Sequence, residues 1–280
     1  MIVDAHHHLW DPARADYPWL TGDLATIRRA FVPEDLAPLL EATGVDGTIL
    51  VQTRSSLEET QEFLETAAAT SFIRGVIGWV DLMDPGVDDT IAALRDGPGG
   101  DHLVGIRHQV HDEPDPAWLL RPDVRRGIAA VGRADLVYDL LVRSRELPAA
   151  RDLVASMPDM RFVVDHLAKP PISTGRLQRW ADLVSTFVPL ENASWKLSGL
   201  VTEADWRQWR PADLAPFVDH ALERLGPDRI VFGSDWPVCL LAASYADVVM
   251  TARDLTSRLT ADERAGIFGD NATRFYRLRV

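Results

Sequence analysis

The sequence predicts an α/β fold in which eight parallel strands and their helices form a (β/α)8 TIM barrel. Eight short, apolar, β-branched runs alternate with longer stretches of helical period. Strands that are apolar throughout, instead of at alternate positions, are typical of a parallel sheet covered on its outer face. Eight such repeats in 280 residues also match the usual size of this barrel.

A doubly wound open sheet is the alternative architecture. Such a sheet usually has fewer strands and a glycine-rich phosphate loop, and no expected strand here is followed by that loop. The chain also has no low-complexity tract, long charge run or Ser/Gly linker. We therefore expect one domain over residues 1–280.

The expected strands are the short apolar runs between turn signals. They are Ile2–His8, Gly47–Gln52, Ile73–Val80, Leu103–His108, Leu136–Leu141, Arg161–His166, Ser194–Ser198 and Arg229–Asp235.

Several of the helices between these strands have recognisable ends. Pro33 is expected in the first turn of one helix, which ends at Gly44. Ser56 and Glu59 form a capping-box pattern before a helix that runs to Ala69. Further helices are expected at Leu147–Met157, Gly175–Val188, Pro211–Gly226 and Tyr245–Leu259, with a C-terminal helix capped by Thr260 and Glu263.

Composition and charge narrow the class of protein. There are 29 Lys and Arg against 42 Asp and Glu, a net charge of −13, which disfavours binding to nucleic acid. No apolar run approaches the ~18 residues of a membrane span, and the N-terminus has no secretory signal pattern. The single cysteine, Cys239, excludes an internal disulfide and is expected to be a packed thiol. We expect a cytoplasmic enzyme or small-molecule binder without membrane or nucleic-acid partners.

The first motif with chemical potential is Asp4-Ala5-His6-His7-His8, at the end of the first strand. Side chains alternate across a strand, so Asp4, His6 and His8 should share the face that points into the barrel. The other face, expected under the helices, carries Val3, Ala5 and His7. Two imidazoles two residues apart can bind one divalent metal, although core histidines with satisfied hydrogen bonds would show the same spacing. Asp4, deeper on the strand, is expected to be a structural hydrogen-bonding partner.

Two further motifs end strands. His166 is the last residue of the sixth expected strand, where a loop or helix-capping histidine is the alternative. Asp235 is the last residue of the eighth expected strand and could bind metal or act as a general base, with an N-cap role as the alternative. In a barrel, both fall on the same C-terminal rim as His6 and His8, which favours a shared site.

Other residues on this rim are candidates for substrate contacts. Arg107 and His108 end the fourth strand, where an arginine could polarise a carbonyl or form a rim salt bridge. Trp79, Lys196 and Trp236 are expected to line a pocket, although alternation does not settle the direction of Lys196. Trp10 and Trp19 lie in a loop where aromatic pocket walls or simple packing are both reasonable.

These motifs together resemble the amidohydrolase superfamily, in particular its amidohydrolase-related branch of sugar lactonases. The matching segments run in order along almost the whole chain. They are Val3–Asp11, Gly105–His108, Phe162–Pro170, Trp195–Leu200 and Phe232–Val238.

The resemblance implies a (β/α)8 barrel with a hydrolytic site at its C-terminal mouth. The metal-binding pair of the superfamily falls on His6 and His8, its sixth-strand histidine on His166 and its eighth-strand aspartate on Asp235. The bridging lysine or glutamate of strand four is replaced by Arg107. Strand five carries Tyr138-Asp139 in place of a histidine. A two-metal site is therefore not expected; one divalent ion, zinc or manganese, and catalysis without a metal remain the two alternatives.

The resulting hypothesis is a hydrolase that opens a small-molecule sugar lactone, of the L-fucono- or L-rhamnono-lactone kind, to the aldonic acid. Asp235 would activate water, Arg107 or a metal would stabilise the oxyanion, and His108 or His166 would protonate the leaving alkoxide. One alternative is a metal-dependent decarboxylase of aromatic or unsaturated acids on the same fold. Another is a sugar-acid binding protein without catalytic activity.

Overall fold

The computed structural model describes residues 1–279 and has the expected (β/α)8 barrel. Eight strands run in chain order around the sheet, and each pairs in parallel with the next. They are β1 (Val3–His7), β2 (Gly47–Val51), β3 (Ile73–Gly78), β4 (Leu103–His108), β5 (Val137–Leu140), β6 (Phe162–Val164), β7 (Ala193–Leu197) and β8 (Ile230–Phe232). Main-chain hydrogen bonds close the barrel, because Asp235 N donates to His6 O at 2.8 Å and His8 N to Trp236 O at 2.7 Å.

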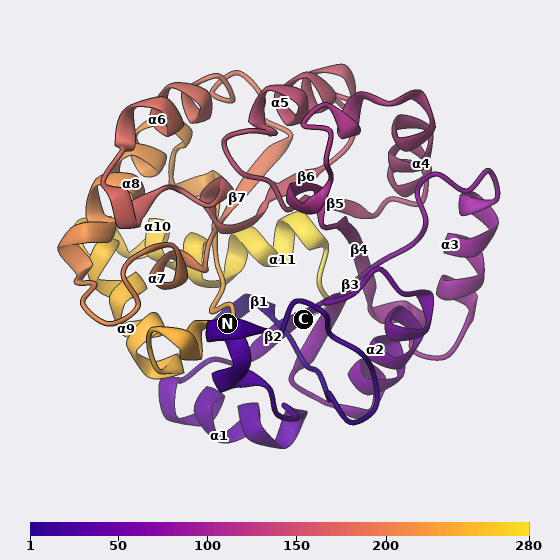
Figure 1. Ribbon diagram of the computed structural model, residues 1–280, viewed down its shortest axis with the longest axis horizontal. Helices are drawn as coiled ribbons and strands as arrows, with labels where there is room; N and C mark the ends of the chain where they lie inside the picture. The colour runs from indigo at the N-terminus through magenta and orange to yellow at the C-terminus, as the bar shows by residue number, and fades with distance from the viewer. Residues whose placement is uncertain (280) are drawn as a thin grey trace.

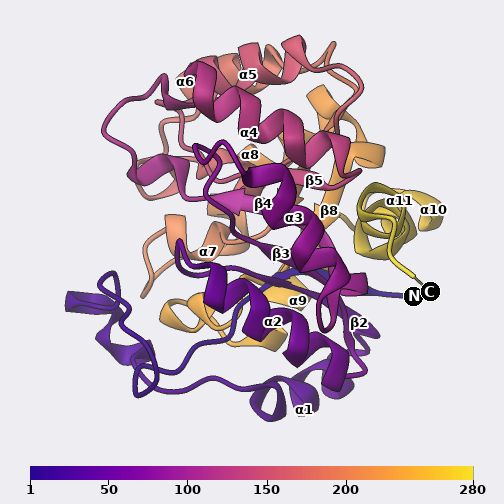
Figure 2. The ribbon, with the colours of Figure 1, turned by 90° about the vertical axis from the view of Figure 1, so that its right-hand side faces the viewer.

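The helices form a ring around the strands (Figure 1). They are α1 (Pro33–Thr43), α2 (Leu57–Ala69), α3 (Val87–Asp96), α4 (Pro122–Arg133), α5 (Leu147–Ser156), α6 (Leu177–Ser185), α7 (Leu200–Glu203), α8 (Pro211–Leu225), α9 (Tyr245–Leu255), α10 (Ala261–Ala265) and α11 (Asn271–Tyr276). Both termini, α10 and α11 lie at one end of the barrel, and the segment between β1 and α1 extends from the other end (Figure 2). Across residues 1–279, every helix is too short or too polar to cross a membrane.

α6 and α9 are shorter than the expected Gly175–Val188 and Tyr245–Leu259. The capping signals were followed with one difference. Ser56 Oγ accepts a hydrogen bond from Glu59 N at 3.2 Å, which confirms the N-cap of α2. The Glu59 carboxylate does not complete a capping box with Ser56. It accepts from the main-chain nitrogens of Thr53 and Arg54 at 2.8 and 2.9 Å, so it supports the turn that leaves β2.

Three helices were not expected from the sequence, α3, α4 and the short α7. α3 and α4 follow the third and fourth strands, and both are rich in charged and small residues. α3 buries only a narrow stripe of Val87, Ile91 and Leu94. These residues have the i, i+4, i+7 spacing of one helix face, and Val124, Ile128 and Val131 of α4 have the same spacing, so the sequence did contain the helical period at both places.

The face assignment of the first strand was wrong for its early residues. Val3 and Ala5 belong to an apolar cluster with Ile49 and Val51, and so face the barrel interior. Asp4 points outward, where its carboxylate meets the hydroxyl of Tyr245 in α9.

A bulge explains why the histidines nevertheless reach the interior. The pairing of β1 with β2 shifts register between Asp4 and His7, so that Ala5 and His6 both face inward. His7 then faces outward and contacts Thr48 Oγ1 at 2.9 Å, and His8 faces inward again. With Val3 and Ala5 facing inward, strict alternation would have placed His7 inward. The extra residue of the bulge reverses this, so that His6 and His8 face the interior.

Asp4 fixes this bulge. Its carboxylate accepts hydrogen bonds from His6 N at 3.1 Å, from Ser234 N at 2.8 Å and from the Tyr245 hydroxyl at 3.1 Å. One buried side chain thus joins β1 to the end of β8 and to α9.

The interior of the barrel is layered. The layer toward the N-terminal ends of the strands is apolar. α11 and the residues after it close this end of the barrel (Figure 1). The layer consists of Val3, Ala5, Ile49, Val51, Ile77, Val104, Val137, Val163, Val231, Ala272, Tyr276 and Leu278. Because the strands are parallel, the next inward residues lie closer to the C-terminal mouth, and these are polar.

Asp4→Ala is expected to lower the free energy of unfolding by about 2–4 kcal/mol, because three buried donors lose their acceptor. Urea unfolding followed by circular dichroism measures this change. Asp159→Ala, at an exposed position, is the matched control and should unfold like the parent protein. Equal stability of the two variants would contradict the anchoring role of Asp4.

Candidate active site

Four predicted residues meet at the C-terminal mouth of the barrel. His6 Nε2 lies 3.2 Å from His8 Nε2 and 3.8 Å from Asp235 Oδ1. Asp235 Oδ1 is also 3.4 Å from His8 Nε2 and 4.0 Å from His166 Nε2. Residues from strands one, six and eight are thus brought within one small site.

The chain reaches this site through unusual backbone conformations. β6 and β8 end earlier than expected, and His166 and Asp235 follow them with φ values of 53° and 58°. Glycines leave room for both turns. A Cβ on Gly199 would lie 2.5 Å from His166 Nδ1, and a Cβ on Gly233 would lie 2.7 Å from the Cβ of His6.

The two outer histidines are oriented by neighbouring strands. His8 Nδ1 lies 2.7 Å from the carbonyl oxygen of Val51, to which it can only donate. In neutral His8, Nε2 is therefore an acceptor directed at His6 and Asp235. His166 Nδ1 lies 2.9 Å from Ser198 Oγ, and its Nε2 faces Asp235.

A network of buried charges lies directly beneath the histidines. Asp165 pairs with Arg107 Nη1 at 2.9 Å and with Lys196 Nζ at 3.0 Å. Lys196 Nζ also contacts Asp139 Oδ2 at 2.5 Å, and the Tyr276 hydroxyl lies 3.0 Å from each Asp139 oxygen. The network links β4, β5, β6 and β7 to α11.

Burial and these charges set the protonation of the site. Burial lowers the pKa of His6 well below its ordinary value, and it lowers the pKa of His166 to about 4. Burial alone would raise the pKa of Asp235. His166 and His8 outweigh burial, so the pKa of Asp235 lies below its ordinary value. At neutral pH, His6 and His166 are therefore neutral and Asp235 is ionised.

Arg107 is held by two partners. Its Nε and Nη2 donate to Gln52, and its Nη1 donates to Asp165 and faces His6 Nε2 at 3.2 Å. Arg107 is 2% exposed. Only Nη1 is directed at the histidine cluster.

The cluster has a donor set that suits one zinc ion. His6 Nε2, His8 Nε2 and Asp235 Oδ1 can all approach one point, and their separations of 3.2, 3.4 and 3.8 Å resemble a tetrahedral edge. For zinc bound at about 2.1 Å, that edge is roughly 3.4 Å. A second potential group, His6, Asp165 and His166, is less suitable because Arg107 and Lys196 already pair with Asp165.

His108 lies in a separate hydrogen-bonded group. The Trp79 indole N–H donates to His108 Nδ1 at 3.1 Å, so His108 Nε2 carries the hydrogen that faces Glu113 Oε1 at 2.7 Å. Trp118 stacks on the His108 ring with centroids 4.3 Å apart. Both nitrogens of His108 are engaged, which leaves neither free to protonate an alkoxide in this arrangement.

The predicted pocket residues differ in their exposure to solvent. Trp79 is partly exposed beside His108. Lys196 is 0% exposed and faces the interior below His6, and Trp236 is 1% exposed and packs against Phe31. Neither Lys196 nor Trp236 reaches an open surface.

Sequence reasoning missed several residues that complete the site. They are Gln52, Glu113, Trp118 and Tyr276, together with the roles of Asp139 and Asp165. Two of them had a local signal, because Gln52 and Asp165 both lie at the end of an expected strand. Tyr276 gave no signal, because it reaches Asp139 across 137 positions of the chain.

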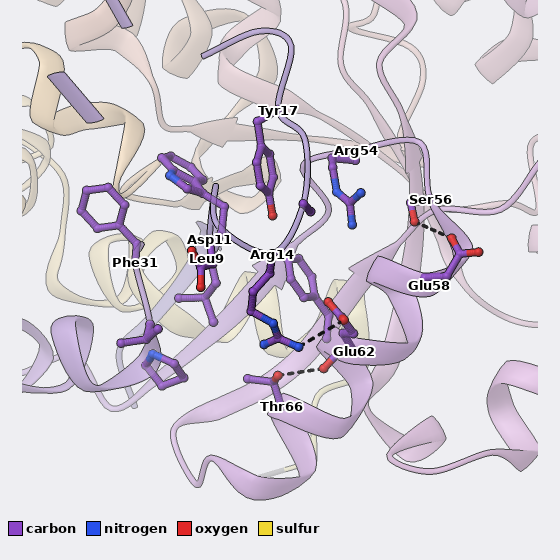
Figure 3. Close-up of a pocket in the computed structure, with 15 residues that line it drawn as sticks. Leu9, Asp11, Arg14, Tyr17, Phe31, Arg54, Ser56, Glu58, Glu62 and Thr66 are labelled. Carbon is purple, nitrogen blue, oxygen red and sulfur yellow. Dashed lines mark hydrogen bonds and ion pairs between the residues drawn. The ribbon is translucent and has the colours of Figure 1, made fainter. Parts of the chain in front are cut away.

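An open cleft of about 450 Å³ lies beside this cluster, between the segment after β1 and α2 (Figure 3). Its walls include Tyr17 and Arg54, and the ion pair of Arg14 with Glu62 at 3.5 Å crosses it. Trp10 lines the cleft and also packs near His8, with ring centroids 6.5 Å apart. The cleft therefore borders the site through Trp10 without including its histidines.

Comparisons with known proteins agree with this geometry. A family model described as "Amidohydrolase" matches residues 3–278. Two proteins named L-fucono-1,5-lactonase are similar: that of Burkholderia multivorans is 40% identical, over 99% of this chain and 96% of its own, and that of Burkholderia ambifaria is 38% identical, over 99% and 95%. A crystal structure of a Burkholderia multivorans amidohydrolase with bound zinc is 39% identical, covers 100% of both chains and has a TM-score of 0.94.

His8→Gln is expected to weaken zinc binding at least about a hundredfold, because one of three protein ligands is lost. Zinc titration by calorimetry, on protein purified without a histidine tag, measures the affinity and stoichiometry. His108→Gln is the matched control, because its imidazole is engaged by Trp79 and Glu113. Equal loss of zinc in both variants would argue against the assigned ligands.

Proposed function

Because the chain belongs to the amidohydrolase family, we propose that its site hydrolyses a sugar-acid lactone of the L-fucono-1,5-lactone type to the aldonic acid. The single observation that carries the proposal is the ionised, buried Asp235 facing two histidines at the mouth of the barrel. The names of the two curated relatives supply the substrate class.

Asp235 is the general base in this proposal. Its carboxylate accepts a proton from water while the water oxygen bonds to the lactone carbonyl carbon. A lowered pKa keeps the carboxylate ionised at neutral pH. His8 and His166 border the carboxylate, and they orient the water between them.

Arg107 stabilises the oxyanion that forms on the carbonyl oxygen. Its Nη1 is directed at the cluster, and a donor aimed at a developing oxyanion is worth roughly 3–4 kcal/mol. When bound by His6, His8 and Asp235, a divalent ion supplies Lewis-acid polarisation of the same carbonyl.

Ring opening breaks the bond between the carbonyl carbon and the ring oxygen. The proton that Asp235 has taken from water passes to the leaving alkoxide, which restores the carboxylate. His166 and His108 fit this step less well than Asp235. His166 has a pKa of about 4 and is neutral, and both nitrogens of His108 have protein partners.

The partly exposed rings of Trp79 and His108, backed by the buried Trp118, are proposed as a wall for the sugar. Trp118 stacks on His108, and the Trp79 indole is fixed to His108 by a hydrogen bond, so the three rings form one rigid group. Aromatic faces of this kind suit the C–H faces of a sugar ring.

The proposal predicts enzyme-dependent proton release from L-fucono-1,5-lactone in weak buffer. A panel of sugar 1,4- and 1,5-lactones, including the D-enantiomer as a matched control and an enzyme-free blank, measures the rate and the stereochemical preference. We expect the L-series to react faster. No reaction across the panel, from folded protein with and without added zinc or manganese, would contradict the lactonase and favour a decarboxylase.

Asp235→Asn should fold normally and lose at least a hundredfold in kcat, because the amide cannot accept the proton of water. Stopped-flow proton release gives kcat, and circular dichroism verifies the fold. Asp228→Asn, on the short turn before β8, is the control for a change of charge outside the site. Near-full activity of Asp235→Asn would remove this residue from the mechanism.

A further inference from the structure

The turn that follows β6 has an unusual run of left-handed backbone. His166, Leu167, Ala168 and Lys169 have φ values of 53°, 48°, 59° and 49°, and none of them is glycine. Residues with a Cβ rarely adopt this conformation, and four in succession are costly. Two hydrogen bonds hold the turn, because Lys169 N donates to His166 O at 2.8 Å and Trp180 Nε1 donates to Leu167 O at 2.7 Å. Backbone strain of this kind is concentrated at sites where a side chain must be placed for function.

The turn places Lys169 on the same side as His166. Its hydrogen bond joins residues i and i+3, whose side chains lie one above the other in a turn of three residues. The His166 ring faces Asp235 with its Nε2, so Lys169 lies over the mouth of the same site. Burial raises the pKa of Asp235, and the nearby imidazoles and then the Lys169 ammonium lower it, so this ammonium is close enough to act on the carboxylate.

The Lys169 ammonium is paired with a carboxylate at the same rim. Its Nζ lies 3.0 Å from Oε1 of Glu203, the last residue of the short helix after β7. The two side chains remain partly exposed, at 19% and 24%. A partly exposed ion pair contributes little to stability, so stability alone does not account for the strained turn.

The use of lysine at this position is also informative. Of the 29 Lys and Arg residues in the chain, only Lys169 and Lys196 are lysines. Lys196 is buried beneath His6, so Lys169 is the lysine that reaches the mouth of the barrel. An ammonium is a compact group with three rotatable donors, whereas a guanidinium is a rigid fork. Lys169 can therefore donate to Glu203 and to a ligand oxygen at the same time.

We propose that Lys169 and Glu203 bind hydroxyl groups of the lactone ring and so determine the preference for hydroxylated lactones. The ammonium donates to one hydroxyl oxygen, and the carboxylate accepts from a neighbouring hydroxyl. This pair follows β6 and β7, whereas Trp79 and His108 lie at the ends of β3 and β4, so the sugar is held from different sides of the barrel. The assignment rests on the proposed lactonase function and names residues that select its substrate.

Steady-state kinetics with L-fucono-1,5-lactone measure the contribution of the pair. Lys169→Met and Glu203→Gln should each lower kcat/KM about tenfold or more, mainly through KM, because a charge-assisted hydrogen bond to the substrate is lost. Arg179→Met removes a positive charge at an exposed position of α6 and is the matched control. A loss confined to kcat, or an equal loss in the control, would overturn the proposal.

The two lysines of the chain also allow a direct binding measurement. Protein labelled with ¹³C at lysine Cε gives one signal for each lysine, and the signal that is absent in Lys169→Met belongs to Lys169. 1,5-Anhydro-L-fucitol, which has the ring hydroxyls of the sugar and no carbonyl, should shift this signal in a saturable way. Tetrahydropyran, the same ring without hydroxyls, is the matched control and should leave it in place. No shift with the anhydro sugar, or the same shift with tetrahydropyran, would overturn the proposal.

The two measurements separate this inference from the proposed function. A saturable shift of the Lys169 signal without turnover of any lactone would contradict the lactonase and support the sugar-binding pair. Turnover of L-fucono-1,5-lactone with an unchanged KM in both variants would support the lactonase and overturn the pair.

Discussion

The arrangement of the barrel interior depends on the pairing of one buried carboxylate, that of Asp165. It is 0% exposed and lies between Arg107 and Lys196, at 2.9 and 3.0 Å. A carboxylate without partners would be very costly there, and so would either cation. Lys196 in turn needs Asp139, and Asp139 is held by Tyr276 of α11. The helix that closes the bottom of the barrel is thereby connected to the residues that hold His6.

Counting these charges explains why Asp235 differs from the other carboxylates. Asp139 and Asp165 are balanced by Lys196 and Arg107, whereas Asp235 is bordered by imidazoles and, among residues 1–279, by no Lys or Arg side chain within 4.0 Å. Its charge is stabilised by imidazoles, and not by the guanidinium and ammonium groups that balance the other two carboxylates. Such a carboxylate can take up a proton and return it without breaking a strong ion pair. The same unbalanced charge also attracts a divalent ion.

The sequence predicted the rim residues better than it predicted their surroundings. Strand ends and barrel topology were sufficient to bring His6, His166 and Asp235 together. Alternation predicted that His6 faces inward, which is correct. The cause is different, because a bulge held by Asp4 changes which residues of β1 face the interior. Contacts such as Tyr276 with Asp139 join distant parts of the chain and have no local pattern. The hydrogen-bonding state of a histidine depends on such contacts, so it could not be derived before the fold.

The position of the hydrogen on the His6 ring distinguishes two states of this site, one that can bind a metal ion through His6 Nε2 and one that cannot. The same side chains of His6, His8 and Asp235 offer three metal ligands when the His6 hydrogen is on Nδ1. With the hydrogen on Nε2, they form a hydrogen-bonded chain beside a free Arg107 donor. Neither state needs a change in the ligand residues, because Lys196 Nζ and Asp165 Oδ1 both face Nδ1 of the ring, at 3.2 and 3.3 Å. The ring nitrogen of His6 that a metal ion would need therefore depends on contacts beneath the histidines as well as on the ligands themselves.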